Sequence, residues 1–269
     1  MDTINLQGKR ALVTGSVQGI GLAIARELAA AGADVILHGL PDAQAHAAAR
    51  AVMAEVAAHP VRALTHDLAD PLQVQRLMAE VLADGALDIL INNAGIQHTA
   101  ALPEMPRAKW DAILAINLSA AFDTMRLALP GMLERGYGRI VNIASVHGLV
   151  ASIHKAPYVA AKFGLVGLTR VAALEAAQAG TRVSGGVTAN CICPGWTETA
   201  IIEPQIKARA ALFGGDRDAG TRDLLREKQP SGRTSLPAEI ARTVLWLCDP
   251  MAHNLTGAAI PVDGGWTAQ

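Results

Sequence analysis

The chain has 269 residues, of which 51% are hydrophobic and 17% are charged, and its formal net charge at pH 7 is −1. This length and apolar content suit one α/β domain with a substantial core and exclude a disordered chain. A nearly neutral charge argues against a nucleic-acid partner, since such proteins usually carry a clustered basic excess.

The N-terminal segment has no apolar signal core, and we expect no apolar run long enough to span a bilayer. Three cysteines, an odd number, do not suggest a secreted disulfide framework. Cys191 and Cys193 share one face of an expected strand, and no Cys or His set at ligand spacing accompanies them. The sequence therefore predicts a soluble cytoplasmic protein with no membrane partner and no metal.

Short apolar segments alternate with longer helical segments along the chain. The expected strands are residues 11–14, 34–38, 61–65, 87–92, 139–144, 188–192 and 258–261. Alanine-rich or amphipathic stretches between the first four predict helices at residues 21–31, 43–58 and 71–83. Because the strands are apolar on both faces and no linker or repeat divides the chain, we predict one α/β domain over residues 1–269. Its doubly wound parallel sheet should have about seven strands, with helices on both faces.

Residues 199–229 depart from this alternation. The segment is helical in character, rich in charge, and interrupted by Gly214 and Gly215. Such a segment is typical either of a mobile helical flap over a substrate site or of an ordinary surface insertion. The sequence alone does not choose between the two.

A glycine-rich turn follows the first expected strand and leads directly into a helix. It reads T-G-S-V-Q-G-I-G over residues 14–21. Glycine lets the backbone approach a pyrophosphate, and the free N–H groups and dipole of a helix N-terminus stabilise its charge. The turn therefore predicts a dinucleotide site. Its expected contacts are Gly15, Ser16, Gly19, Ile20 and Gly21.

Polar or small residues also follow two other expected strands. Asp67 and Leu68 end the third strand, where a carboxylate and backbone groups suit an adenine edge. The fourth strand ends in N-N-A-G at residues 92–95, whose small side chains let a flat ring come close. Ligands of open parallel sheets bind beyond the carboxyl ends of strands, so we expect Asn93 and Gly95 at the same crevice, although each turn alone is ordinary turn chemistry.

The second strand ends in His38, Gly39 and Leu40. An acidic residue here binds the 2′-hydroxyl of NAD, and a basic residue binds the 2′-phosphate of NADP. Neither is present, the glycine-rich turn carries no Arg or Lys, and Asp42 would repel a phosphate. NAD is therefore the expected cofactor, with Leu40 among its contacts.

Ser145, Tyr158 and Lys162 form a pattern that suits proton transfer. Tyr158 and Lys162 are four residues apart, so on a helix they share one face, about 6 Å apart along the axis. A tyrosine titrates near pH ~10, and we expect the ammonium to lower the pKa of Tyr158 toward the range of a general acid/base. The Ser145 hydroxyl would hold the reacting oxygen. The nucleotide site upstream strengthens this otherwise weak signal.

These motifs, in this order, resemble the short-chain dehydrogenase/reductase family over nearly the whole chain, and the resemblance implies a Rossmann-type fold. It adds Asn117, in A-I-N-L-S, as a fourth catalytic residue that shapes a backbone site for a water of the proton relay. Tyr158 would exchange the substrate hydroxyl proton, and Lys162 would lower its pKa and hold the nicotinamide ribose. By the same resemblance, the nicotinamide lies beside Pro194, Gly195, Thr197 and Thr199.

Residues between the shared motifs resemble one subgroup of that family, the bacterial D-3-hydroxybutyrate dehydrogenases. The matching segments include N-N-A-G-I-Q-H-T-A, I-A-S-V-H-G-L-V-A-S, C-P-G-W and V-D-G-G-W-T-A. The resemblance implies NAD-linked interconversion of (R)-3-hydroxybutyrate and acetoacetate at Ser145 and Tyr158. It implies further substrate contacts from Gln97, His147, Lys155, Trp196 and Gln205. Without it, Lys155 would be taken for a solvated surface lysine.

Two other functions stay open. A family member acting on another small hydroxy acid or on a carrier-linked 3-oxoacyl substrate is one, although a carrier-linked reductase would need a basic 2′-phosphate site and a basic docking face. A cofactor-sensing protein without catalysis is the other, and the intact set of four catalytic residues opposes it.

The helix expected at residues 158–177 is apolar on more than one face. Such a helix is buried by the sheet on one side and by a partner subunit on another. The family resemblance implies a homotetramer, with residues 263–266 resembling a tail used in subunit contacts. The connection at residues 180–187 is longer than the family usually has, and its place at the amino end of the sheet should keep it away from the chemistry.

Overall fold

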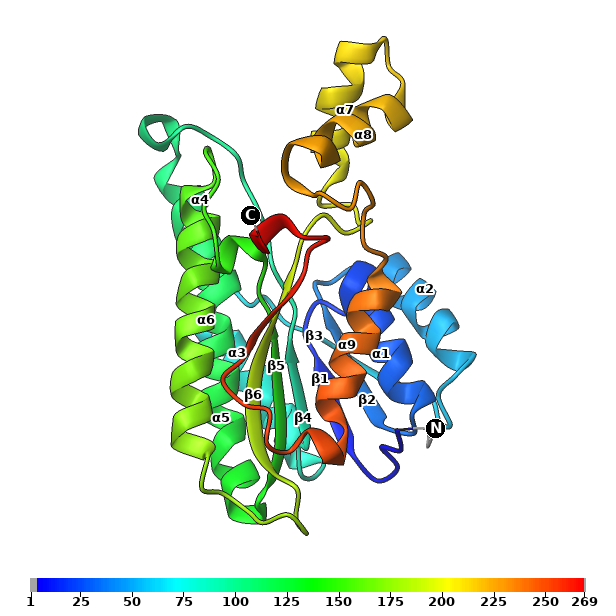
Figure 1. Ribbon diagram of the computed structural model, residues 1–269. Helices are drawn as coiled ribbons and strands as arrows, with labels where there is room; N and C mark the ends of the chain where they lie inside the picture. The colour runs from blue at the N-terminus through cyan, green and yellow to red at the C-terminus, as the bar shows by residue number, and fades with distance from the viewer. Residues whose placement is uncertain (1–3, 269) are drawn as a thin grey trace.

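In the computed structural model, which describes residues 4–268, seven strands form one parallel sheet. The strands are β1 (Arg10–Val13), β2 (Asp34–Gly39), β3 (Arg62–Thr65), β4 (Ile89–Asn92), β5 (Tyr137–Ile143), β6 (Gly186–Pro194) and β7 (Ala259–Val262). They lie in the order β3-β2-β1-β4-β5-β6-β7 (Figure 1). This confirms the predicted doubly wound sheet.

The strand order reverses between β1 and β4. The chain first moves outward from β1 to β2 and β3, and then returns to place β4 on the other side of β1. In an open parallel sheet, ligands bind at this switch point, beyond the carboxyl ends of the strands. The glycine-rich turn leaves β1 and the N-N-A-G turn leaves β4, so the fold brings the two predicted cofactor turns together.

Helices cover both faces of the sheet, as predicted. One layer holds α1 (Gly19–Ala30), α2 (Ala43–Ala54) and α9 (Pro237–Cys248), and the other holds α3 (Pro71–Ala83), α4 (Arg107–Leu114), α5 (Ala120–Arg135) and α6 (Ala156–Ala176) (Figure 1). Along β1, Ala11 and Val13 pack in the core beneath α1, whereas Leu12 packs in the core on the opposite face. Alternate side chains of a strand point to opposite faces, so the sheet is buried on both.

β5 and β6 begin earlier than the sequence suggests. Their parallel pairing starts at Tyr137 and Gly186, although glycines in these segments read as turn residues. A Cβ at Gly138 would lie 2.6 Å from Met132 Sδ, so this glycine is needed for close packing of α5 on the strand. α2 ends at Ala54, before the predicted residue 58, with Pro60 close behind.

The long connection before β6 lies at the amino end of the sheet, as predicted. Arg139 is fully buried beneath it and donates hydrogen bonds to the carbonyl oxygens of Gly185 at 3.1 Å and Gly186 at 2.9 Å. These bonds fasten the connection to the start of β5, at the end of the sheet opposite the two cofactor turns.

A continuous helical segment, Arg107–Arg135, joins α4, a π-helical turn at Ala115–Ser119 and α5. An 18-residue window of this segment has a mean hydropathy of 1.4, so by length and composition alone it could cross a membrane, contrary to the expectation that no apolar run is long enough. One such helix is weak support for a membrane span, because core helices pass the same test. Here the segment packs against α3 and α6, which accounts for part of its apolar surface.

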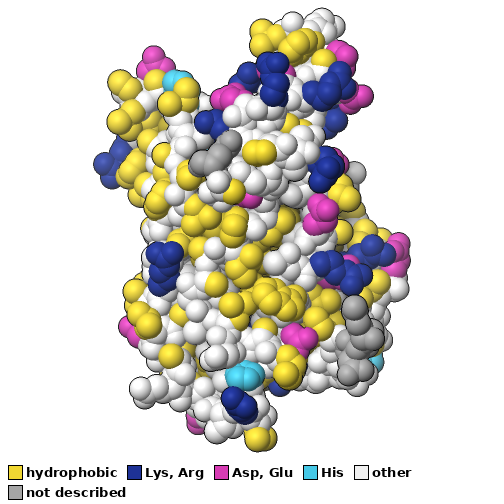
Figure 2. All heavy atoms as spheres, viewed as in Figure 1, with side chains coloured by type: hydrophobic (Ala, Val, Ile, Leu, Met, Phe, Trp, Pro, Cys, Tyr) yellow, Lys and Arg dark blue, Asp and Glu magenta, His cyan; other side chains and the backbone are white. Residues whose placement is uncertain are grey.

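The segment predicted as a helical flap contains α7 (Glu203–Ala210), a 3-10 turn (Ala211–Phe213) and α8 (Arg217–Lys228). The helices pack on each other and project beyond the carboxyl end of the sheet (Figure 1). Basic and acidic side chains are interspersed on this lobe (Figure 2), and Arg209 pairs with Asp223 at 2.9 Å. Its helical character is confirmed, and its motion over a site stays a prediction.

Candidate active site

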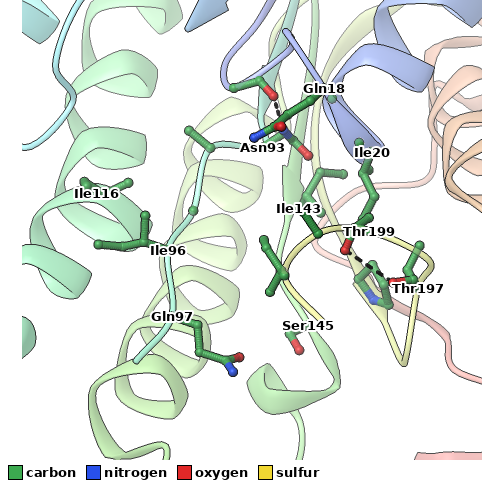
Figure 3. Close-up of a pocket in the computed structure, with 18 of the residues that line it drawn as sticks. Gln18, Ile20, Asn93, Ile96, Gln97, Ile116, Ile143, Ser145, Thr197 and Thr199 are labelled. Carbon is green, nitrogen blue, oxygen red and sulfur yellow. Dashed lines mark hydrogen bonds between the residues drawn. The ribbon is translucent and has the colours of Figure 1, made fainter. Parts of the chain in front are cut away.

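One cavity of about 480 Å³ runs along the carboxyl ends of the strands and beneath the start of the flap. Its walls come from the glycine-rich turn, the N-N-A-G turn, the ends of β5 and β6, the first two turns of α6 and residues 199–205. Figure 3 shows Asn93 and Gln97 from the loop after β4, Ser145 from the end of β5 and Thr199 from the segment after β6 around this space. The fold therefore unites most of the residues that the sequence singled out.

The glycine-rich turn is shaped for a close ligand. α1 begins at Gly19, and among residues 4–268 no side-chain capping bond from Gln18 satisfies its first N–H groups. Gly15 has a φ of 62°, and a Cβ at Gly21 would lie 2.3 Å from the Gly15 carbonyl oxygen. Free N–H groups at a helix start, with backbone that no side chain shields, fit the pyrophosphate of a dinucleotide.

Ser16 is the exception among the predicted cofactor contacts. Its side chain is fully buried, and its Oγ accepts a hydrogen bond from the His38 N–H at 2.9 Å. It fastens the turn to β2 and does not belong to the cavity lining, so a contact of Ser16 with the cofactor stays a prediction. Val17 and Gln18, which the sequence analysis passed over, line the cavity instead.

The His38 side chain also fastens the glycine-rich turn. Its Nδ1 accepts from the Gly15 N–H at 3.2 Å, and its Nε2 donates to the His66 carbonyl oxygen at 3.0 Å. These two bonds fix one neutral tautomer. Burial lowers the pKa of His38 to about 4, so the end of β2 carries no positive histidine at neutral pH. Leu40, a predicted cofactor contact, lines the cavity just beyond.

The N-N-A-G turn is tied to the first turn by side chains. Asn93 Nδ2 donates to the carbonyl oxygens of Thr14 at 2.9 Å and Gly15 at 3.1 Å. Thr14 Oγ1 accepts from the Asn93 N–H at 3.0 Å. The Asn93 amide thus acts mainly by holding the two turns together. The other predicted lining residues of the cofactor side are present: Gly95, Asp67, Leu68, Pro194, Gly195, Thr197 and Thr199.

Ser145, Tyr158 and Lys162 converge at the middle of the cavity. Tyr158 and Lys162 project from α6, with Lys162 Nζ 5.7 Å from the Tyr158 ring centroid. Lys162 Nζ donates to the Ile143 carbonyl oxygen at 2.7 Å, which anchors the ammonium to the end of β5. Ser145 follows β5, and its Oγ accepts from the His147 N–H at 3.2 Å. Two hydroxyl groups and an ammonium therefore surround one space.

Asn117 lies behind this group, in the π-helical turn between α4 and α5. Its Oδ1 accepts from the Ile96 N–H and its Nδ2 donates to the Ile96 carbonyl oxygen, both at 2.9 Å. The side chain is buried and holds the loop that follows β4. A π-turn shifts the backbone hydrogen bonds by one residue and is frequent at functional sites, which suits the predicted water site on the backbone here.

The pKa of Tyr158 shifts in the direction opposite to the prediction. Burial raises the pKa of Tyr158, and the Ser145 hydroxyl opposes the rise only in part. Burial also lowers the pKa of Lys162 to about 8. Because desolvation disfavours both charged forms, the expectation that Lys162 lowers the pKa of Tyr158 was wrong for the chain by itself.

A buried lysine faces the same space. Lys155 is 9% exposed, and no carboxylate among the described residues pairs with it. Its Nζ lies 3.4 Å from His147 Nε2 and 4.9 Å from the centroid of a Trp196 ring. Burial lowers the pKa of Lys155 to about 8. Reading Lys155 as a solvated surface residue would therefore have been wrong, and a buried ammonium without a carboxylate is suited to an anionic ligand.

His147 is neutral at this point of the cavity. Burial, together with the nearby Lys155 ammonium, lowers the pKa of His147 to about 4. Its Nδ1 lies 3.4 Å from the Val150 carbonyl oxygen, to which it donates, so Nε2 is free to accept from Lys155. Neutral His147 therefore orients the Lys155 ammonium without adding a second positive charge.

Gln97 and Gln205 meet across the cavity. With the Gln205 amide oriented to donate to the carbonyl oxygens of Ile201 at 2.9 Å and Ile202 at 3.0 Å, its Oε1 accepts from Gln97 Nε2 at 2.8 Å. This contact joins the loop after β4 to the first helix of the flap. Both predicted amides thus reach the site.

Trp266 is a site residue that the sequence analysis assigned to subunit contacts. Its ring centroid lies 5.5 Å from that of His147 and 5.6 Å from that of Trp196, and the residue is 7% exposed. The C-terminus lies near the carboxyl end of the sheet (Figure 1), which brings the tail of the chain over the cavity. Periodicity gave no signal for this return, and only the resemblance of the V-D-G-G-W-T-A segment marked it.

Residues 9–210 match the sequence family described as short chain dehydrogenase. The chain belongs to the short-chain dehydrogenase family. It is 49% identical over 267 residues to the D-beta-hydroxybutyrate dehydrogenase of Cupriavidus necator, covering 98% of this chain and 100% of that one. It is 43% identical over 268 residues to that of Rhizobium meliloti, covering 97% and 99%.

Solved structures of this short-chain dehydrogenase family share the fold. The structure of a gluconate 5-dehydrogenase from Burkholderia cenocepacia, in complex with NADP and tartrate, has a TM-score of 0.85 and 33% identity, covering 98% of this chain and 97% of that one. Family and fold are therefore as predicted. The protein is an oxidoreductase with a nicotinamide dinucleotide cofactor, and the cavity beside the glycine-rich turn fits that cofactor.

Proposed function

We propose that this short-chain dehydrogenase interconverts (R)-3-hydroxybutyrate and acetoacetate with NAD. The observation that carries the substrate assignment is the buried ammonium of Lys155 beside Ser145 and Tyr158 in one cavity. A short 3-hydroxy acid has a carboxylate for the ammonium and a hydroxyl for the two catalytic oxygens. The two relatives named D-beta-hydroxybutyrate dehydrogenase, 49% and 43% identical to this chain, support the proposal.

In the reaction, Tyr158 takes the proton of the substrate hydroxyl, and Ser145 Oγ holds the same oxygen. The bound dinucleotide supplies the acceptor for the hydride that leaves the carbinol carbon. Lys162, anchored on the Ile143 carbonyl oxygen, holds the nicotinamide ribose and passes the proton onward to a water at the Asn117 turn. Gly95, Pro194, Gly195, Thr197 and Thr199 would hold the nicotinamide half of the cofactor, and Leu40, Asp67 and Leu68 would hold the adenosine half.

The remaining groups orient the acid. Lys155 donates to the substrate carboxylate while neutral His147 holds the ammonium in place. The amides of Gln97 and Gln205 supply further donors at the same end of the cavity. Trp196 and Trp266 enclose the methyl end. A pocket with ionic, hydrogen-bonding and apolar parts suits a small hydroxy acid.

Cofactor choice gives a testable difference. The cavity walls near β2 contain Asp42 and a neutral, fully engaged His38, and no arginine lies among the described residues that line the cavity. A 2′-phosphate would therefore meet a carboxylate with no basic partner, and we expect kcat/KM for NAD to exceed that for NADP roughly 10²-fold. Initial rates with each cofactor at saturating substrate measure this. Equal values, or a preference for NADP, would contradict the assignment.

Initial rates with other substrates separate this function from a carrier-linked reductase and from a cofactor sensor without catalysis. A carrier-linked 3-oxoacyl reductase needs a basic docking face, whereas Figure 2 shows basic and acidic side chains interspersed around the flap. Faster reduction of a carrier-linked substrate than of acetoacetate would favour that alternative. Formation of acetoacetate by the purified protein would eliminate a sensor without catalysis.

We also propose that the protein is a homotetramer. Large apolar side chains of the α5 and α6 layer are exposed in the single chain, and they include Phe122, Leu133, Phe163, Val171 and Leu174. Exposed apolar residues gathered on neighbouring helices are typical of a subunit interface. The molar mass in solution, from light scattering, tests the proposal.

A further inference from the structure

Gln229, at the C-terminal end of α8, is only 1% exposed, although the preceding turn of the helix is rich in charged residues. Its side chain lies where three segments meet: residues 194–198 after β6, residues 229–235 after the flap, and residues 262–266 before the C-terminus. A buried amide is unfavourable unless its donors and acceptors are satisfied. The contacts that satisfy this one therefore indicate what it does.

The Gln229 amide ties the start of the flap to its end. Its Oε1 accepts from the Trp196 N–H at 2.9 Å, and its Nε2 donates to the Arg233 carbonyl oxygen. Backbone bonds reinforce the link, because the Ser235 N–H donates to the Trp196 carbonyl oxygen at 2.8 Å and the Glu198 N–H donates to the Ser235 carbonyl oxygen at 3.0 Å. The amide and these bonds form one clasp at the base of the flap.

Two glycines pack closely against the Gln229 side chain. A Cβ at Gly195 would lie 2.7 Å from Gln229 Oε1, and a Cβ at Gly264 would lie 2.8 Å from Gln229 Cγ. Gly195 directly precedes Trp196, and Gly264 stands two residues before Trp266. The side chain therefore sets the backbone position of both tryptophans that wall the cavity.

We propose that Gln229 is a positioning residue for the substrate pocket. It lies outside the residues that line the cavity, and it acts by fixing Trp196 and Trp266 relative to the end of β6. Affinity for the hydroxy acid depends on this clasp, whereas binding at the glycine-rich turn does not. The proposal rests on the proposed function only for the choice of test substrate.

Gln229→Met keeps the length of the side chain and removes both hydrogen bonds. Because the buried Trp196 N–H loses its acceptor, we expect the KM for (R)-3-hydroxybutyrate to rise roughly ten- to hundred-fold. The dissociation constant for ADP-ribose, which lacks the nicotinamide that Gly195 would contact, should stay within about two-fold of the wild-type value by calorimetry, since the amide does not touch the glycine-rich turn. A rise in the KM without a rise in the dissociation constant separates a local positioning role from a general loss of structure.

Gln229→Glu adds a pH readout. A protonated carboxyl accepts from the Trp196 N–H and donates to the Arg233 carbonyl oxygen as the amide does, whereas a carboxylate cannot donate. We expect the ratio of the variant KM to the wild-type KM to be near one at low pH and to rise as the carboxyl ionises, while the ratio for Gln229→Met stays high throughout. Asp263, Lys228 and Arg233 flank the site and are unchanged in every variant, so a difference between variants arises from position 229.

Gln75→Glu, on the exposed face of α3, is the matched control and should leave the KM ratio near one at every pH. A Gln229→Met KM equal to that of the wild type, or equal rises in the KM and the ADP-ribose dissociation constant, would overturn the proposal. If Gln229→Met does not fold, the pH-dependent ratio of Gln229→Glu decides. If the wild type does not turn over (R)-3-hydroxybutyrate, the proposed function fails, and a crystal structure of Gln229→Met with Trp196 and Trp266 unmoved would still refute the positioning role.

Discussion

Replacing Tyr158 with phenylalanine is expected to abolish most turnover of (R)-3-hydroxybutyrate while leaving cofactor binding intact. Phenylalanine keeps the ring on α6 and removes the hydroxyl that exchanges the substrate proton. General acid/base catalysis contributes about 10²–10⁴-fold, so kcat should fall by that amount. Because burial raises the pKa of Tyr158, the wild-type rate of oxidation should rise with pH as the phenolate forms.

The second tyrosine of the chain is a matched control. Tyr137 is buried at the amino end of the sheet, and its hydroxyl has no hydrogen-bond partner among residues 4–268. Tyr137→Phe therefore removes an equivalent hydroxyl far from the cavity, and its kcat should match that of the wild type. Steady-state rates and NADH titration of both variants test the assignment. A Tyr158→Phe enzyme with the wild-type kcat would refute it.

Replacing Lys155 with methionine is expected to weaken binding of the acid and spare the cofactor. Methionine keeps much of the packing on Trp196 and removes the only ammonium assigned to the substrate carboxylate. A hydrogen bond to a charged group contributes roughly 1.5–3 kcal/mol, so the KM for (R)-3-hydroxybutyrate should rise about ten- to hundred-fold. The KM for NAD should change far less. Lys109→Met, at an exposed position on α4, should change neither constant.

The pH dependence of anion binding gives an independent test of Lys155. Burial lowers the pKa of Lys155 to about 8, so the ammonium is present below this pH and is lost above it. Inhibition by butyrate, a carboxylate that cannot react, should therefore be strongest below pH 8 and weaken as the pH rises through 8. In Lys155→Met the contribution of Lys155 to this pH dependence should be lost, which leaves only the weaker dependence that Lys162, whose pKa is also lowered to about 8, produces. Equal KM rises for the acid and for NAD, or the same pH profile in both proteins, would count against a carboxylate contact.

The sequence predicts the frame of the protein well, since strand and helix patterns arise from local chemistry. The parallel sheet, the helical character of residues 199–229 and the two cofactor turns all follow from apolar segments with glycine or asparagine at strand ends. The start of β5 was missed because Gly138 reads as a turn residue, and its close packing on Met132 is visible only in three dimensions.

Contacts between distant segments were harder to predict. The burial of Lys155 depends on Trp196, 41 positions later, and Trp266 reaches the cavity only because the chain returns over the sheet after β7. The pKa of Tyr158 was misjudged for a related reason: the spacing to Lys162 is local, whereas the burial that outweighs it comes from the whole fold. The bond of Ser16 Oγ to the His38 N–H could not be predicted because His38 lies on the neighbouring strand.

The central claim is that Lys155 and the Ser145–Tyr158 pair hold the two ends of one hydroxy acid, with its methyl group against the tryptophans. Three fixed contacts make the site chiral around the carbinol carbon. Only one enantiomer can therefore direct its carbinol hydrogen toward the nicotinamide. The decisive measurement is the initial rate of NADH formation with (R)- and with (S)-3-hydroxybutyrate. We expect NADH and acetoacetate in equal amounts from the (R) acid and a rate at least about 10²-fold lower from the (S) acid. No NADH from the (R) acid, or equal rates with both, would contradict the account.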